Sequence, residues 1–176
     1  MRGRVLGLLL VLCPLIASGQ SLDDQSLDGP GFDGLGFDGL RETGDAFSLP
    51  DPGTVLTFPD DHGPHDGFRI EWWYVTANLI GPDGTDYGAQ WTLFRNALAP
   101  QASQGWGSPV IWMAHAAVTT PQTHYSAERF ARGGIGQAGV TAEPFEAWID
   151  DWSMAGPNFE DITITAQDTD FAYDLD

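Results

Sequence analysis

The fold prediction rests on one stretch of the sequence, Phe58-Pro-Asp-Asp-His-Gly-Pro-His-Asp-Gly-Phe-Arg-Ile-Glu-Trp-Trp-Tyr-Val-Thr-Ala-Asn-Leu79. It places two histidines, four acids, an arginine and three consecutive aromatic residues at the start of a predicted β-strand. Because side chains alternate along a strand, Trp72 and Trp73 must point to opposite faces. Both faces therefore carry large rings, so one face is covered and the other meets a cavity, a partner or solvent.

Alternating segments separated by turn residues continue to the end of the chain. We predict strands over 68–80, 87–96, 110–119 and 145–152, and a last hairpin over 161–175 that turns at 167–169. The 110–119 segment carries no acid or arginine, which is typical of a central strand buried on both sides. Residues 125–132 fit either a short helical turn or an irregular strand. No long amphipathic helix is indicated, so we predict an all-β antiparallel barrel or sandwich.

Three regions follow one another along the chain. Residues 1–19 have the pattern of an export signal, with Arg2 and Arg4 before an apolar segment and small residues at 17–19; a membrane anchor is the alternative. Residues 20–52 contain an Asp/Gly repeat that is too poor in apolar area to fold, so we predict a flexible linker rather than a calcium site. Residues 53–176 form the predicted domain. Since the chain stops within an alternating segment, we expect a C-terminal part to be missing.

The chain is strongly acidic. Its formal net charge is −18, and none of its seven basic residues is a lysine. Such a surface repels phosphate backbones, which argues against a nucleic-acid partner. The single cysteine, Cys13, lies in the predicted signal and lacks the small preceding residue of a lipid-attachment site. Once the signal is removed, the mature chain would have no thiol and no integral membrane segment.

The order and spacing of several motifs resemble the AttH, or carotenoid 1,2-hydratase-like, family. The resemblance runs from about Gly53 to Asp176. It is carried by Phe58-Pro-Asp-Asp-His-Gly-Pro-His65, Glu71-Trp-Trp-Tyr-Val-Thr76, Trp91-Thr-Leu-Phe-Arg95, Trp112-Met-Ala-His115, Glu128-Arg129, Arg132 and Ala138-Gly-Val-Thr-Ala142. It implies tandem lipocalin-like β domains around an apolar cavity, of which this chain covers the N-terminal domain, and a partner domain absent from the chain. It also implies, for some members, the addition of water to a carotenoid double bond.

Alkene hydration needs a neutral carboxylic acid that protonates carbon and aromatic rings that stabilise the resulting cation. Glu71 is the candidate acid and His115 the candidate polarising group. Glu71 paired with Arg69, Arg95 or Arg129 would instead be ionised and structural, and we favour that reading. His115, between Met113 and Ala117, is also interpreted as a satisfied core histidine.

His62 and His65, flanked by acids, form a His-x-x-His pattern. These side chains are potential ligands for zinc or another divalent ion. The pattern lies on a Gly/Pro loop, and the resemblance implies no metal. We therefore predict no metal and no cofactor, and assign the histidines to the mouth of the cavity.

These observations predict an exported, periplasmic or secreted, lipocalin-like protein that binds a hydrophobic small molecule, a lipid or an isoprenoid, in a tryptophan-lined cavity. A hydratase-type enzyme and a carbohydrate-binding or surface-attachment module are the alternatives. The predicted ligand-binding residues are His62, His65, Arg69, Trp72, Trp73, Tyr74, Trp91, Arg95 and Trp112.

Overall fold

The computed structural model describes residues 47–100 and 105–176, which fold into two antiparallel sheets. The first, sheet A, contains β1 (Ile70–Ile80), β2 (Asp86–Ala97), β3 (Val110–Thr119) and β4 (His124–Arg132) in that order. The second, sheet B, contains β5 (Ala138–Thr141), β6 (Phe145–Ile149), β7 (Trp152–Asn158), β8 (Asp161–Gln167) and β9 (Ala172–Leu175), also in chain order. Two single-turn 3-10 helices, η3 (Asp60–His62) and η4 (Gly105–Gly107), lie in loops. The all-β prediction is confirmed.

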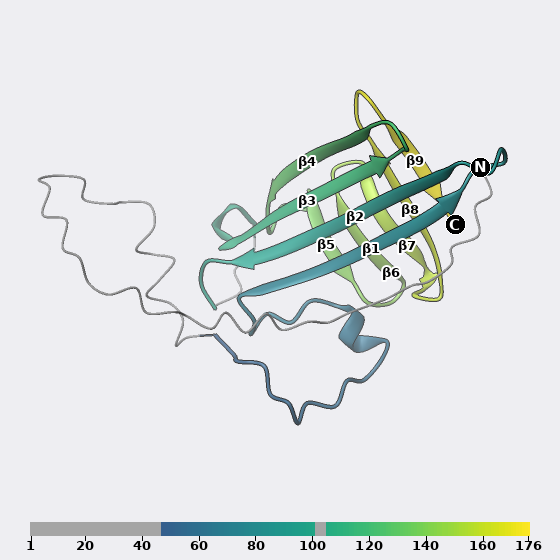
Figure 1. Ribbon diagram of the computed structural model, residues 1–176. Coiled ribbons are helices and arrows are strands. Elements are labelled where there is room, and N and C mark those ends of the chain that lie inside the picture. Colours follow the sequence, from purple (N-terminus) through teal and green to yellow (C-terminus); the bar gives the residue numbers. More distant parts are fainter. Residues whose placement is uncertain (1–46, 101–104) are drawn as a thin grey trace, which may run out of the picture.

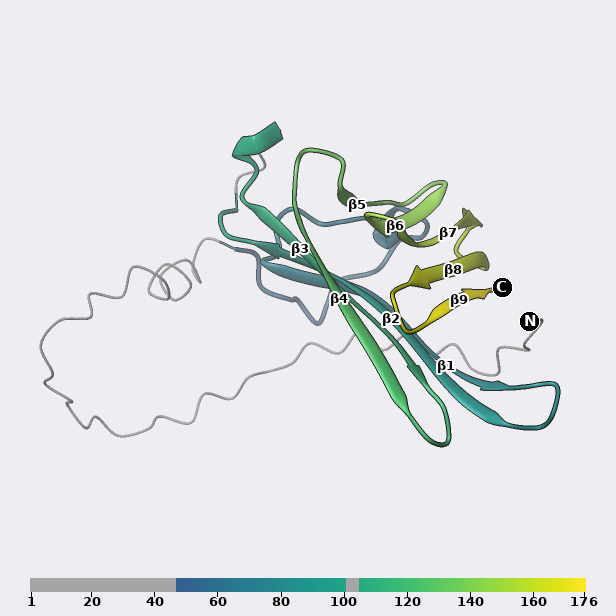
Figure 2. The ribbon, with the colours of Figure 1, turned by 90° about the horizontal axis from the view of Figure 1, so that it is seen from above.

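The two sheets lie face to face, and the strands of one cross those of the other at a steep angle (Figure 1). They do not join into a closed barrel within the described residues, so of the two predicted forms the molecule adopts the open one. The β1–β2 and β3–β4 hairpins continue beyond the edge of sheet B, where their tips stand apart from it (Figure 2).

Tight turns set the register of the strands. Gly84, with φ of +82°, closes the β1–β2 turn by donating its N–H to the Gly81 carbonyl at 3.0 Å. Glycine is favoured there because a side chain strains a backbone with positive φ. Asp150, with φ of +52°, begins the turn between β6 and β7, and aspartate tolerates this conformation better than most residues. The first turn separates the strands predicted over 68–80 and 87–96, whereas the second falls within a segment that was predicted as one strand.

The core lies between the sheets and is built from alternate residues of each strand. Val75, Trp91 and Ala116 occupy one cross-strand row on the inner face of sheet A, and Phe145 and Trp152 face them from sheet B. Burial of such large rings stabilises the fold by roughly 2–3 kcal/mol per side chain. The intervening residues of sheet A form its outer face.

Two side chains connect the sheets by hydrogen bonds. Arg129 on β4 donates to the Gln167 carbonyl at 3.1 Å and lies 4.5 Å over the Trp152 ring. Tyr173 on β9 donates its hydroxyl proton to the Gln90 carbonyl at 2.7 Å. These contacts fix how sheet B sits on sheet A.

Three predictions about the strands were wrong in detail. Of the two forms predicted for residues 125–132, a helical turn or an irregular strand, the structure has a strand, β4, which pairs regularly with β3. The predicted strand 145–152 is divided by the Asp150–Asp151 turn, and residues 152–158 form a separate strand, β7. The 110–119 strand is central, but its outer face is partly exposed at Ile111, Met113 and His115. The predicted signal and the repeat lie outside the described residues.

Candidate functional site

The charged residues of the opening motif meet at the start of β1. His65 lies in the loop before the strand, and its backbone N–H donates to both carboxylate oxygens of Glu71 at 3.0 Å. Its imidazole is held on two sides: Nδ1 lies 2.8 Å from Glu71 Oε1, and Nε2 lies 2.9 Å from Asp61 Oδ1. The loop therefore folds back onto the strand that follows it.

Arg95 completes this cluster from the neighbouring strand. It is paired in register with Glu71 and is only 3% exposed. Its guanidinium donates to Glu71 Oε2 at 3.1 Å, to Asp66 Oδ1 at 2.8 Å and to the Phe68 carbonyl at 3.0 Å. A planar fork suits this task, because it places several donors at fixed angles. The pairing of Glu71 with an arginine, which we favoured, is confirmed, and Arg95 is the partner.

The pKa values of the cluster follow from these contacts. The hydrogen bond to Asp61, helped by Glu71, raises the pKa of His65 above its usual value, because both carboxylates favour the charged form of the ring. The same bond lowers the pKa of Asp61. Burial raises the pKa of Glu71, although its bonds to His65 and the charge of Arg95 oppose this. Because both Glu71 oxygens accept hydrogen bonds within the cluster, the geometry gives this carboxylate a structural role.

His62 holds the same loop in a different way. Its carbonyl accepts a hydrogen bond from Trp73 Nε1 at 2.8 Å, and its ring stacks on Phe159 with centroids 4.2 Å apart. Burial lowers the pKa of His62, so its ring is neutral at neutral pH. The two histidines therefore point to different partners. No group of three or more potential metal ligands occurs among the described residues.

The predicted site residues fall on opposite faces of sheet A. Those on the inner face are Glu71, Trp73, Trp91, Arg95 and Trp112. Those on the outer face are Trp72, Tyr74 and His115. Arg69 precedes β1, and its carbonyl accepts a hydrogen bond from Ala97 N at 2.8 Å, which pairs the start of β1 with the end of β2.

His115 is separated from Glu71 by the sheet. Its side chain is about half exposed, lies 4.0 Å from Glu128 and packs edge-on against Phe94. It is therefore not a core histidine. It also cannot act with Glu71 on one substrate atom, because a closed layer of backbone lies between them. The assignment of these two residues to one catalytic pair is corrected.

The tryptophans predicted to line a cavity fill the core instead. Trp91 and Trp112 are buried, and Trp73 packs against Trp112 with ring centroids 6.0 Å apart. Their rings occupy the space between the sheets in which a cavity was expected.

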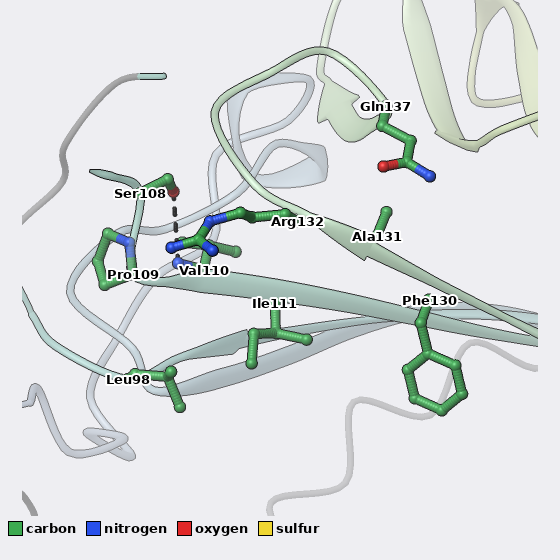
Figure 3. A pocket seen from close by; sticks show the side chains of 9 residues that line it. All are labelled: Leu98, Ser108, Pro109, Val110, Ile111, Phe130, Ala131, Arg132 and Gln137. Carbon is green, nitrogen blue, oxygen red and sulfur yellow. Dashed lines mark hydrogen bonds between the residues drawn. The ribbon is translucent and has the colours of Figure 1, made fainter. Parts of the chain in front are cut away.

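A hollow with different walls lies where β2 ends and β3 begins. It has a volume of about 420 Å³ and is lined by Leu98, Ser108, Pro109, Val110, Ile111, Phe130, Ala131, Arg132 and Gln137 (Figure 3). Most of these residues are apolar, and Arg132 lies beside Ser108, Pro109 and Val110 (Figure 3). No motif in the sequence predicted this site. The sequence signal for it is Arg132, which ends β4 and follows the apolar residues Phe130 and Ala131.

A second hollow, of about 590 Å³, lies near the tips of the two long hairpins. Its walls carry polar side chains, among them Asn78, Gln90, Thr119 and His124. No helix of the described residues is long and apolar enough to cross a membrane.

Comparison with known proteins agrees with this architecture. The AttH-like family profile matches residues 49–176. A solved structure from Nitrosomonas europaea, assigned to AttH, superposes with a TM-score of 0.62 at 30% sequence identity. The match covers 73% of this chain and 39% of that one, so this chain corresponds to less than half of its relative. A comparison with curated proteins gives no match. The chain belongs to the AttH-like family.

Proposed function

We propose that this AttH-like chain binds an amphipathic small molecule, a lipid or isoprenoid with an apolar body and an anionic head. One observation carries this proposal, the apolar hollow that has Arg132 in its wall. Its volume of about 420 Å³ falls within the range of about 300–1,000 Å³ that is usual for small-molecule sites. Leu98, Ile111 and Phe130 are exposed there, where an apolar chain would remove them from water.

Arg132 supplies the charge that selects the head group. Its side chain is exposed and makes no ion pair with any described residue. An unpaired arginine is notable in a chain with 25 acids and seven basic residues. A carboxylate suits its planar fork, which offers two parallel N–H donors.

Two other functions receive less support from the geometry. A hydratase needs a carboxylic acid that is free to donate, whereas Glu71 accepts bonds from His65 and Arg95. A sugar-binding platform built on Trp73 and Trp112 receives less support, because both side chains pack in the core region.

The test is calorimetric titration of the chain with oleate and with oleyl alcohol. Arg132→Gln should weaken oleate binding about tenfold or more, because a charged hydrogen bond contributes roughly 1.5–3 kcal/mol, and should leave binding of the alcohol unchanged. Leu98→Asp, in the wall, should weaken both. Val55→Asp is the matched control, because Val55 is exposed and lies outside the hollow. Binding that neither wall variant alters would refute the site.

We also propose that this binding takes place outside the cytoplasm. The proposal is supported by the signal-like composition of residues 1–19. Sequencing the N-terminus of the protein recovered from its host tests it: a start near Gln20 is expected, and an intact Met1 in the mature protein would contradict it.

A further inference from the structure

A row of four apolar side chains crosses the outer face of sheet A. Trp72 on β1 pairs in register with Phe94 on β2, Phe94 with Met113 on β3, and Met113 with Phe130 on β4. Each strand thus contributes one large side chain to one continuous row, which we call the apolar row. It is partly open to solvent, and Phe130 is 57% exposed.

The adjacent row extends this apolar surface. Ile70 and Ile111 lie in it on the same face, and they are 50% and 43% exposed. An antiparallel sheet with a solvated face normally shows polar residues there. Contiguous exposed apolar surface on a soluble domain marks a place of association.

Sheet B provides the internal comparison. The corresponding row on its outer face runs Trp148, Ser153, Thr165 and Asp174. Ser153 and Thr165 hydrogen bond to each other at 3.0 Å, so polar side chains occupy the middle of this row. The two outer faces of one molecule thus differ in character, and only that of sheet A carries an unbroken apolar row.

We propose that a second copy of this chain covers the outer face of sheet A, so that two sheets A pack face to face across a two-fold axis. The dimensions fit. Strands of 9–12 residues, with a rise of about 3.4 Å per residue and a spacing of about 4.8 Å, give a face of roughly 600–700 Å². A stable interface buries about 800 Å² of accessible surface per partner, and stacked sheets are a standard way to do so.

Charge also favours this face, over the other faces of the molecule, as the contact between two copies. The chain carries a net charge of −18, so most of its surface repels another copy. On the outer face of sheet A the acids are Asp86, far from the apolar row, and Glu128, on the edge strand, and Arg132 offsets one of these two charges. The face is therefore close to neutral where two copies would meet.

Analytical ultracentrifugation from low to high micromolar concentration tests this proposal on the full chain. The wild-type protein should sediment as a dimer. Met113→Glu places a charge within the apolar row, and Phe130→Glu does so at an exposed position that is safer for folding. Each should raise the dimer dissociation constant at least a hundredfold. Thr165→Glu, on the polar row of sheet B, is the matched control and should leave dimerisation unchanged.

Circular dichroism of each variant should show that it is folded. A wild-type chain that stays monomeric at every concentration would overturn the proposal, as would dimers that persist in both folded variants. So would a shift to the monomer in Thr165→Glu, which would place the interface on sheet B. Ile111 and Phe130 also line the hollow assigned to the ligand, so Phe130→Glu alters both sites. Met113 does not line that hollow, so Met113→Glu separates a failure of this proposal from a failure of ligand binding.

Discussion

Glu71 and Arg95 face each other across the first two strands, with Arg95 Nη1 3.1 Å from Glu71 Oε2. The carboxylate side chain is 13% exposed and that of the arginine is 4% exposed. Removing one partner of such a pair leaves the other charge buried.

Glu71→Ala should therefore lower the free energy of unfolding by about 3–5 kcal/mol. Glu71→Gln should lower the free energy of unfolding by a smaller amount, since the amide oxygen still accepts a hydrogen bond from Arg95. Urea denaturation measures both. Glu146→Ala, at an exposed position on β6, is the control and should change stability by less than about 0.5 kcal/mol. Equal effects at the two positions would contradict the structural role of the pair.

His65 should make stability depend on pH. Its pKa in the folded protein is raised above 6.5, chiefly by its hydrogen bond to Asp61. The stabilisation is therefore complete below pH 6.5 and is lost as the pH rises through the folded pKa. Glu71 acts in the same direction, because burial raises its pKa above 4.5 and disfavours its charged form as the pH rises.

Urea midpoints measured from mildly acidic to mildly alkaline pH should fall in the wild-type protein and fall less steeply in His65→Gln. His124→Gln, at an exposed position on β4, serves as the control and should follow the wild type. Parallel profiles for wild type and His65→Gln would show that the imidazolium does not stabilise the loop.

Arg129 should contribute to the docking of the two sheets. Arg129→Met keeps the apolar stem but removes the bonds to Gln167 and Asp168 and the cation over Trp152. It should lower the free energy of unfolding by about 1–2 kcal/mol. Arg132→Met is the matched control, because Arg132 has no ion pair among the described residues; a loss below about 0.5 kcal/mol is expected. Denaturation followed by tryptophan fluorescence makes the comparison, and equal losses would refute the docking role.

Gly156 lies where backbone leaves no room for a side chain. An added Cβ would collide with the carbonyl oxygen of Asp161 and lie 3.0 Å from Ile162 Cα, at the irregularity where β7 and β8 shift register. Backbone atoms cannot move aside as a flexible side chain does. Gly156→Ala should therefore cost about 3 kcal/mol in thermal or urea unfolding. Gly53→Ala, which would meet only the side chain of Asp51, should be nearly neutral.

Most strands could be predicted from alternation, and the failures have physical reasons. From Phe145 to Ile149 the buried residues occupy odd positions, and from Trp152 they occupy even ones. That change of phase shows the two-residue turn, which was missed when the segment was taken as one strand. β5 was missed because Ala138–Thr141 is short and contains a glycine.

The site was less predictable, since it depends on register and on which face is covered. Alternation placed Glu71 and Trp73 on one face, but only the length of the β1–β2 turn decides that Arg95 lies opposite Glu71. It also grouped Met113 with His115, yet nothing local shows that their face is the outer one. Sheet B decides that, because it covers the other face.

The chain-order arrangement of both sheets has a consequence for how the molecule assembles. Each hydrogen-bonded strand pair in the described residues joins consecutive strands, so pairing needs only short loop closures, which favours rapid formation. Sheet A is complete in sequence at Arg132, before any residue of sheet B leaves the ribosome. We therefore expect sheet A to pair during synthesis with its inner tryptophans still open to water. The bonds from Arg129 to Gln167 and from Tyr173 to Gln90 would form last, when sheet B packs over these tryptophans.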